Sequence, residues 1–126
     1  MNSKLFNTFF DNELGLTHFE YYIIHNKNNI GEYQLTFEYN KVTLSLFKIN
    51  KKYRGNGFAK KALKEINYQL SLFSNDFDFS LIELNAKSFN YSPLNNNQLI
   101  LLYEKYFDME IHSIEKDEIL MKRVIH

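Results

Sequence analysis

Hydrophobic and polar residues alternate along two stretches in the first half of the chain, 31–39 and 42–49. This period of two is typical of β-strands. Residues 18–25 are aromatic and β-branched, which also favours a strand. Short polar turns separate the three stretches, so the pattern predicts an antiparallel meander. Residues 3–14 fit two structures, either a short helix capped by Ser3 or an extended arm.

The hydrophobic period changes to three and four at Phe58, and this predicts a helix over residues 58–73. Its apolar face comprises Ala59, Ala62, Leu63, Ile66, Leu70 and Phe73. Residues 79–86 follow as a further strand. A strand, helix and strand in this order form a parallel pair through a right-handed crossover, so we expect residues 79–86 to pair with 42–49.

The last third of the chain predicts a polar loop over 87–95, a helix over 96–107, and a hairpin of strands 109–114 and 118–124. One face of this helix carries Leu99, Leu102, Tyr103 and Tyr106. The predicted order is β-β-β-α-β-α-β-β. We therefore expect an α+β fold with a mixed, mostly antiparallel sheet flanked by helices, in a single domain over residues 1–126.

Composition and charge narrow the possible functions. Lys and Arg number 15 and Asp and Glu number 15, so nothing indicates a nucleic-acid or membrane surface. The chain has no cysteine and its four histidines show no ligand spacing, so we expect no metal site. No apolar run approaches the ~20 residues of a membrane span, and Asp11 and Glu13 interrupt the N-terminus where a signal peptide is apolar. We expect a cytoplasmic protein.

The loop 51–57 carries the most informative chemistry, because Gly55 and Gly57 stand immediately before the helix that opens at Phe58. Glycine lets backbone N–H groups approach a ligand, and the start of a helix presents unpaired N–H groups and a partial positive charge. Such a turn is an anion site. Seven basic residues surround it with no acid before Glu65, namely Lys48, Lys51, Lys52, Arg54, Lys60, Lys61 and Lys64.

The glycine spacing excludes two common phosphate loops. No Gly-Lys-Ser/Thr follows, as a Walker A loop requires, and the third small residue, Ala59, comes one position too early for a dinucleotide-binding fingerprint. Arg54-Gly-Asn-Gly-Phe-Ala59 instead resembles motif A of the GNAT superfamily of acyl-CoA-dependent N-acetyltransferases. The segment 96–105, Asn-x-x-Leu-x-x-Leu-Tyr-Glu-Lys, resembles a second motif of that family.

This resemblance implies an N-acetyltransferase that moves an acetyl group from acetyl-CoA to a primary amine by direct attack in a ternary complex. The general acid would be Tyr103. The base would be Glu83, with Glu38 as the second candidate. The implied coenzyme contacts are Phe47, Lys48, Ile49, Arg54, Gly55, Asn56, Gly57, Phe58, Ala59, Lys60 and Asn96. The partners would be acetyl-CoA and an amine acceptor, a small molecule or a protein amine, and the protein would be a monomer or a homodimer.

Departures from the family pattern keep an alternative open. Lys52 stands where Gln or Arg is usual, Leu99 replaces a small alanine, and the helices that often build the acceptor pocket are largely missing before the loop. The alternative is a catalytically inactive module that binds acyl-CoA as a regulator or interaction partner. Tyr103 also fits a core residue, and Glu83 fits an ordinary surface acid.

Overall fold

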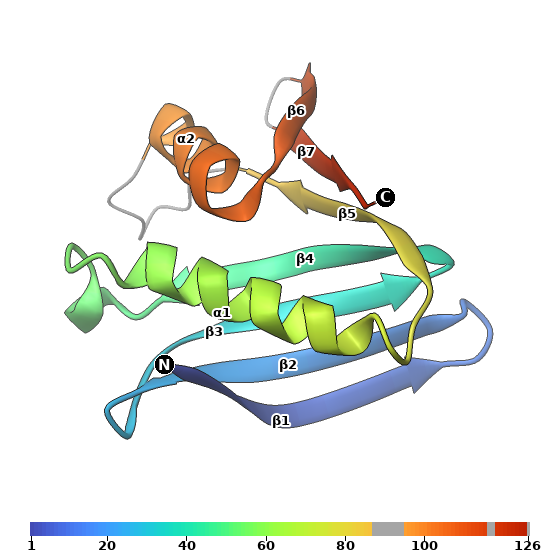
Figure 1. The fold of residues 1–126 in the computed structure, drawn as a ribbon, viewed down its shortest axis with the longest axis horizontal. Helices are drawn as coiled ribbons and strands as arrows, with labels where there is room; N and C mark the ends of the chain where they lie inside the picture. The colour runs from blue at the N-terminus through green and yellow to red at the C-terminus, as the bar shows by residue number, and fades with distance from the viewer. Residues whose placement is uncertain (87–94, 116–117, 126) are drawn as a thin grey trace.

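The computed structural model describes residues 1–86, 95–115 and 118–125 (Figure 1). Its elements in chain order are β1 (Asn2–Asp11), β2 (Leu16–His25), β3 (Asn28–Glu38), β4 (Asn40–Ile49), the 3-10 turn η1 (Lys51–Tyr53), α1 (Phe58–Phe73), β5 (Phe79–Asn85), α2 (Asn96–Phe107), β6 (Glu110–Glu115) and β7 (Glu118–Val124). The predicted loop 87–95 and the predicted turn 115–117 lie mostly outside the described residues.

All seven strands form one sheet in the order β1-β2-β3-β4-β5-β7-β6 (Figure 1). The pair β4–β5 is parallel and the other pairs are antiparallel. The helix α1 connects the two parallel strands, as the crossover rule requires. The predicted α+β fold with a mixed, mostly antiparallel sheet is therefore confirmed.

The first residues form a strand, so a helix over residues 3–14 is wrong. β1 pairs with β2 over its whole length, from Asn2 opposite Ile24 to Asp11 opposite Leu16. The hydroxyl of Ser3 contacts the hydroxyl of Tyr33 at 2.6 Å and also bonds the Glu65 carboxylate of α1. An isolated helix of this length is marginal in water, whereas the free edge of β2 offers a full ladder of hydrogen bonds.

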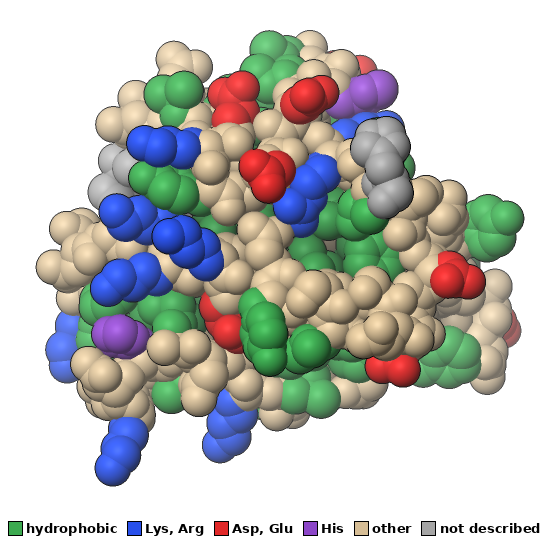
Figure 2. Space-filling view, viewed as in Figure 1, with side chains coloured by type: hydrophobic (Ala, Val, Ile, Leu, Met, Phe, Trp, Pro, Cys, Tyr) green, Lys and Arg blue, Asp and Glu red, His purple; other side chains and the backbone are tan. Residues whose placement is uncertain are grey.

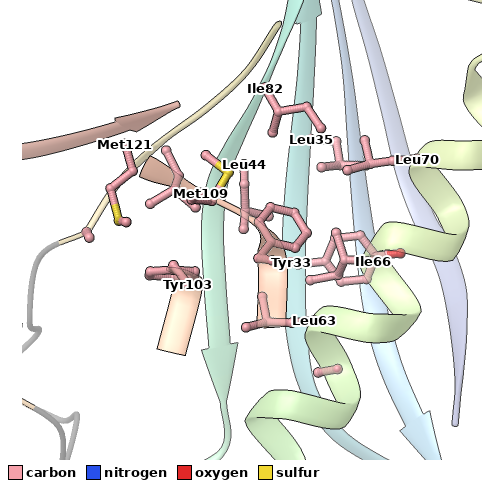
Figure 3. Close-up of a cluster of buried hydrophobic side chains, with 14 of the residues drawn as sticks. Tyr33, Leu35, Leu44, Leu63, Ile66, Leu70, Ile82, Tyr103, Met109 and Met121 are labelled. Carbon is pink, nitrogen blue, oxygen red and sulfur yellow. The ribbon is translucent and has the colours of Figure 1, made fainter. Parts of the chain in front are cut away.

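Both helices contribute to a single core on one face of the sheet, which we call the covered face. Figure 3 shows Leu63, Ile66 and Leu70 of α1 pointing toward Tyr33 and Leu35 of β3. All five side chains are at most 3% exposed. The predicted face of α1 is confirmed, with Ala62, Leu63, Ile66 and Leu70 as its buried members.

The buried stripe of α2 differs from the predicted one. Its innermost residues are Ile100, Tyr103 and Phe107, while Leu99, Leu102 and Tyr106 pack partly buried beside the core. Spacing at three and four allows either stripe, and the contact with α1 selects between them. Asn95 and Gln98 form a capping box at the start of the helix, and Asp108 ends it with φ 51°.

The other face of the sheet, which we call the open face, has none of the described helices over it. Its side chains alternate with the core residues along each strand. On β3 these are Glu32, Gln34, Thr36 and Glu38, all half-buried. Polar and charged residues pair across this face, so the sheet has one apolar side and one polar side.

Candidate active site

β4 and β5 separate halfway along β4, and this separation defines the candidate site. Their parallel pairing runs from Asn40 opposite Phe79 to Leu44 opposite Leu84. β4 then continues to Ile49, while Asn85 of β5 pairs with Leu120 of β7. Figure 1 shows β5 diverging from β4 toward α2. The last residues of β4 therefore have no partner strand on this side within the described chain, and we call the gap in the ladder the opening.

A β-bulge lies at the start of the opening. Gln34 of β3 pairs with Leu46, but the next residue, Leu35, pairs with Leu44, so Ser45 is the extra residue of β4. A bulge bends its strand and redirects the side chains around it. Ser45 is exposed, and it is the first residue of β4 beyond the last β5 pair.

The backbone of β4 directs polar groups into the opening. The N–H of Asn50 donates to the carbonyl of Ile30 in β3 at 2.8 Å. Successive residues of a strand direct their backbone groups to opposite edges, so those of Ile49 and Phe47 face the opening while those of Lys48 face β3. The carbonyl of Ile49 accepts a hydrogen bond from Nε of Arg54 at 2.9 Å.

The turn after β4 leads into the start of α1, and its backbone N–H groups are positioned to bind a ligand. Gly55 and Gly57 have φ 81° and 74°, which L side chains rarely adopt. Gly57 is the N-cap, no side chain caps the helix, and its first turn contains no acid. In the described part of the chain no group accepts a hydrogen bond from the amides of Gly55, Asn56 or Gly57.

Basic side chains gather around this turn. Figure 2 shows Lys and Arg side chains clustered where α1 begins in Figure 1. Lys51, Lys52 and Lys60 are exposed, and Arg54 is half-buried. Lys48 differs from the rest, because its ammonium lies 3.8 Å from the Glu32 carboxylate, to which its strand position directs it on the open face.

Tyr103 lies on the covered side of the opening. Its ring is 6.5 Å from the ring of Phe47 at an interplanar angle of 61°, and the side chain is 7% exposed. Burial raises the pKa of its hydroxyl well above the usual value near 10, so Tyr103 keeps its proton at neutral pH. No described residue forms a hydrogen bond with this hydroxyl. A buried hydroxyl that keeps its proton is suited to donate that proton to a ligand.

Glu83 lies on the open face with two ion pairs. Its carboxylate oxygens are each 3.3 Å from an ammonium, one of Lys41 and one of Lys122. Lys41 also lies 3.3 Å from Glu38. Although burial acts to lower it, hydrogen bonds to Glu83 and Glu38 raise the pKa of Lys41 above its usual value, so Lys41 stays charged. The Glu83 carboxylate is therefore held between two ammonium groups on the open face.

Two parts of the site were not predicted. The bulge at Ser45 has no local signal, because it depends on how β4 registers against β3. The cap of α2 does have one, since Asn95 followed three residues later by Gln98 matches a capping box. Asn96 is the first residue of α2 and is exposed.

Metal and membrane features were also searched. In residues 1–86, 95–115 and 118–125, no three His, Cys, Asp or Glu side chains lie close enough together to bind a metal ion. None of the helices in these ranges has the length and apolar character needed to cross a membrane.

Comparison with known proteins identifies the fold. No family model and no curated protein matches the sequence. Among solved structures, a GNAT family acetyltransferase from Elizabethkingia anophelis with acetyl-CoA bound has a TM-score of 0.64 and 17% identity, over 86% of this chain and 76% of its own. Aminoglycoside acetyltransferase AAC(6')-Ib in complex with coenzyme A and kanamycin has a TM-score of 0.60 and 19% identity, over 88% and 67%.

The PaiA N-acetyltransferase from Thermoplasma acidophilum, in complex with coenzyme A, has a TM-score of 0.59 and 13% identity over 85% of this chain. The match spans 60% of the length of PaiA. The three proteins share the arrangement of strands and helices described above. The chain has the fold of the GNAT superfamily.

Proposed function

We propose that this protein transfers an acetyl group from acetyl-CoA to a primary amine by direct attack in a ternary complex. The observation that carries the proposal is the opening between β4 and β5. β4 forms one edge of the opening, and the glycine turn and the start of α1 follow it in the chain. Tyr103 of α2 lies beside Phe47 of β4. The proposed anion site, a strand edge that faces the opening and the proposed proton donor are thus adjacent.

The start of α1 is the proposed site of the coenzyme diphosphate. The amides of Gly55, Asn56 and Gly57 would bind its oxygens, together with the first helical amides, which have no intrahelical acceptor. Exposed lysines would add attraction without competing for the amides. The proposed contacts there are Arg54, Gly55, Asn56, Gly57, Phe58, Ala59 and Lys60, with Asn96 contributing from α2.

The exposed edge of β4 is the proposed site of the pantetheine arm. Phe47 and Ile49 direct backbone groups into the opening. The backbone groups of Lys48 face β3 instead, so Lys48 would contribute to this site as the residue that joins the other two. When bound, acetyl-CoA supplies an acetyl group activated as a thioester. A backbone N–H of the 47–49 segment would stabilise negative charge on the carbonyl oxygen, and Tyr103 would hold the proton that the departing sulfur takes.

A second candidate function is an acyl-CoA-binding module without transferase activity. One observation favours it, since none of the described helices covers the open face beside the opening to enclose an acceptor. Such a module would bind acetyl-CoA as tightly as an enzyme does and would acetylate no amine.

The first test is thermal unfolding with acetyl-CoA, coenzyme A or ATP. A ligand at 100 times its dissociation constant stabilises the folded state by ~2.7 kcal/mol. For a chain of this size we expect the midpoint to rise by roughly ten degrees with acetyl-CoA, and little with ATP. The absence of a shift with any of the three would contradict both candidate functions.

Tyr103→Phe then separates the enzyme from the binding module. We expect kcat for acetylation of a panel of primary amines to fall by a factor of about 100, with unchanged affinity for acetyl-CoA. Tyr106→Phe is the matched control, because Tyr106 lies on the same helix and its ring contacts Lys60 and Lys105. Equal kcat in wild type and Tyr103→Phe would remove Tyr103 from the mechanism.

A further inference from the structure

A hydrogen-bonded chain crosses the open face and ends at the opening. The hydroxyl of Ser45 lies 3.2 Å from the hydroxyl of Thr36 on β3. The Thr36 hydroxyl lies 2.8 Å from Nδ1 of His18 on β2, and Nε2 of His18 lies 3.3 Å from a carboxylate oxygen of Glu20. Three neighbouring strands thus link the bulge residue to a histidine.

The sheet register explains why these side chains meet. His18 stands directly opposite Thr36 in the β2–β3 ladder. Thr36 pairs with Thr43 on β4, so the extra residue introduced by the bulge brings Ser45 close to it on the same face. Ser45 is exposed, while the side chains of His18 and Glu20 are 20% and 22% exposed. The chain is therefore most exposed at Ser45, beside the opening, and only partly exposed at His18 and Glu20.

Proton donors and acceptors align in one direction along this chain. In the tautomer of His18 that carries its proton on Nε2, Nε2 donates a hydrogen bond to the Glu20 carboxylate and Nδ1 accepts one from the Thr36 hydroxyl. The oxygen of Thr36 can then accept from Ser45. The single Ser45 proton has an alternative acceptor in the carbonyl of Gln34 at 3.3 Å, and the relay uses the orientation toward Thr36. In this arrangement a proton received at Ser45 ends on His18.

We propose that His18 accepts the proton of the attacking amine, through the hydroxyls of Thr36 and Ser45. This inference rests on the proposed acetyltransferase function and identifies its base. The acceptor amine would approach from the open face, opposite the side on which Tyr103 lies. Attack and protonation of the leaving group would then occur from opposite sides of the sheet.

The proton transfers balance. The ammonium form of the acceptor gives one proton to Ser45 as the Ser45 proton moves to Thr36 and the Thr36 proton moves to Nδ1 of His18. The nitrogen lone pair forms the C–N bond, the C–S bond breaks, and sulfur takes the Tyr103 proton. The second proton on the new amide nitrogen returns through water to Tyr103. The products are the amide, the free thiol and one proton, which His18 releases to solvent.

The charged groups around His18 favour this role over Glu83. His18 stands opposite Phe9 on β1 and opposite Thr36 on β3. Its neighbours along this face are Glu20 on its own strand and Asn7 opposite Glu20 on β1. The next acids on this face are Glu38 and Asp11. Glu32, Glu38 and Glu83 each lie within 4 Å of a lysine. Glu20 instead faces an imidazole and the amide of Asn7. A carboxylate placed this way stabilises the imidazolium that forms.

The pH dependence of kcat/KM tests the proposal. In wild type we expect an acid limb in this profile, because a base that is already protonated accepts no proton from the amine. His18→Asn should lower kcat/KM at pH 7 by a factor of about 100 and remove that limb, while acetyl-CoA binding stays unchanged. His112→Gln, at an exposed position on β6, is the control and should keep the limb. An unchanged limb in His18→Asn would overturn the proposal.

Substitutions at Thr36 distinguish proton transfer from packing. Thr36→Val keeps the shape and removes the hydroxyl, so we expect the same loss as in His18→Asn. Thr36→Ser keeps the hydroxyl and should retain activity. These two variants test the proton relay even if His18→Asn fails to fold. Equal activity in Thr36→Val and Thr36→Ser would overturn the proposal.

Nitrogen-15 NMR of the imidazole gives a readout that needs no turnover. We expect His18 to carry its proton on Nε2 in wild type, and the Nδ1 signal to shift in Thr36→Val and not in Thr36→Ser. A proton on Nδ1 would overturn the relay even in an active enzyme. Failure of the acetyltransferase function is recognised separately, because wild type itself would then acetylate no amine at any pH, and this would overturn the relay as well.

Discussion

The two faces of the sheet differ most where β4 and β5 separate. On the covered face the neighbours of Phe47 are apolar, and Tyr103 is buried with a raised pKa. On the open face, two residues earlier along the strand, Ser45 begins a chain of hydroxyl, imidazole and carboxylate groups. Both environments come from a single strand, because the bulge turns Ser45 to the open face, whereas regular alternation would have put it on the same side as Phe47.

This difference separates the opposing tasks of acyl transfer. A proton donor needs a group that keeps its proton, which burial provides. A proton acceptor needs partners that stabilise the charge it gains, which the polar face provides. The proposed acid and the proposed base therefore lie on opposite faces of the sheet.

The largest expected effect tests whether stability comes from the covered face. Ile66 of α1 is fully buried, so Ile66→Ala removes apolar contacts and leaves a cavity. We expect the free energy of unfolding to fall by about 2–5 kcal/mol. Gln34→Ala, half-buried on the open face, should change it by less than about 0.5 kcal/mol. Urea denaturation of both variants measures the difference, and equal losses would contradict the assignment of the core.

A smaller effect tests the turn that leads from the opening into α1. Gly57→Ala places a Cβ on a residue with φ 74°, which costs about 1–2 kcal/mol. Gly15→Ala is the matched control, because Gly15 has φ 63° and equally open surroundings in the turn between β1 and β2. Both variants should lose similar stability by urea denaturation.

Only Gly57→Ala should also weaken acetyl-CoA binding, since only Gly57 lies at the proposed diphosphate site. Isothermal titration calorimetry with acetyl-CoA measures this. Equal affinity in the two glycine variants would mean that the turn serves the fold alone.

The smallest effect concerns the alkaline stability of the covered face. Burial raises the pKa of Tyr21 to about 12, and burial raises that of Tyr33 beside it further. In the unfolded chain a tyrosine titrates near 10, so the unfolded state loses its proton first. The contribution is complete below pH 10 and is lost as the pH rises from about 10 to 12.

At pH 11 we therefore expect wild type to lose up to about 1.4 kcal/mol through Tyr21, relative to pH 9. Tyr21→Phe should lose correspondingly less over the same range. Tyr39→Phe is the control, since Tyr39 is 97% exposed and should leave the pH dependence unchanged. Thermal unfolding between pH 8 and 11 measures all three proteins, and parallel curves would contradict the assignment of Tyr21 to the covered face.

Local pattern was enough to predict most elements. The helices over residues 58–73 and 96–107 have the predicted bounds, because hydrophobic spacing and end signals are properties of short segments. The parallel pairing of β4 with β5 followed from the order of strand, helix and strand. The residues predicted to contact the coenzyme, Tyr103 and Glu83 stay predictions, since no ligand defines their contacts.

The N-terminal segment shows where local pattern fails. Leu5, Phe6, Phe9 and Phe10 have a spacing that suits a helix face, yet they lie on β1, where each is more than a third exposed. The edge of β2 decides the outcome, and that edge exists only once the sheet has formed. Local pattern also fails for the side chain of Lys48. In the sequence it groups with the basic residues of the turn, but its position opposite Glu32 directs it to the open face.

The sequence by itself determined the order of elements, the two amphipathic helices and the glycine turn at the start of α1, because each depends on residues close together in the chain. Only the tertiary structure decided the register that bulges β4 at Ser45, ends its pairing at Leu44 and brings His18 and Thr36 beside that bulge. Register depends on the fit of whole strands to one another. For this reason the glycine turn before α1 could be predicted from the sequence, while the hydrogen-bonded chain that reaches His18 could not.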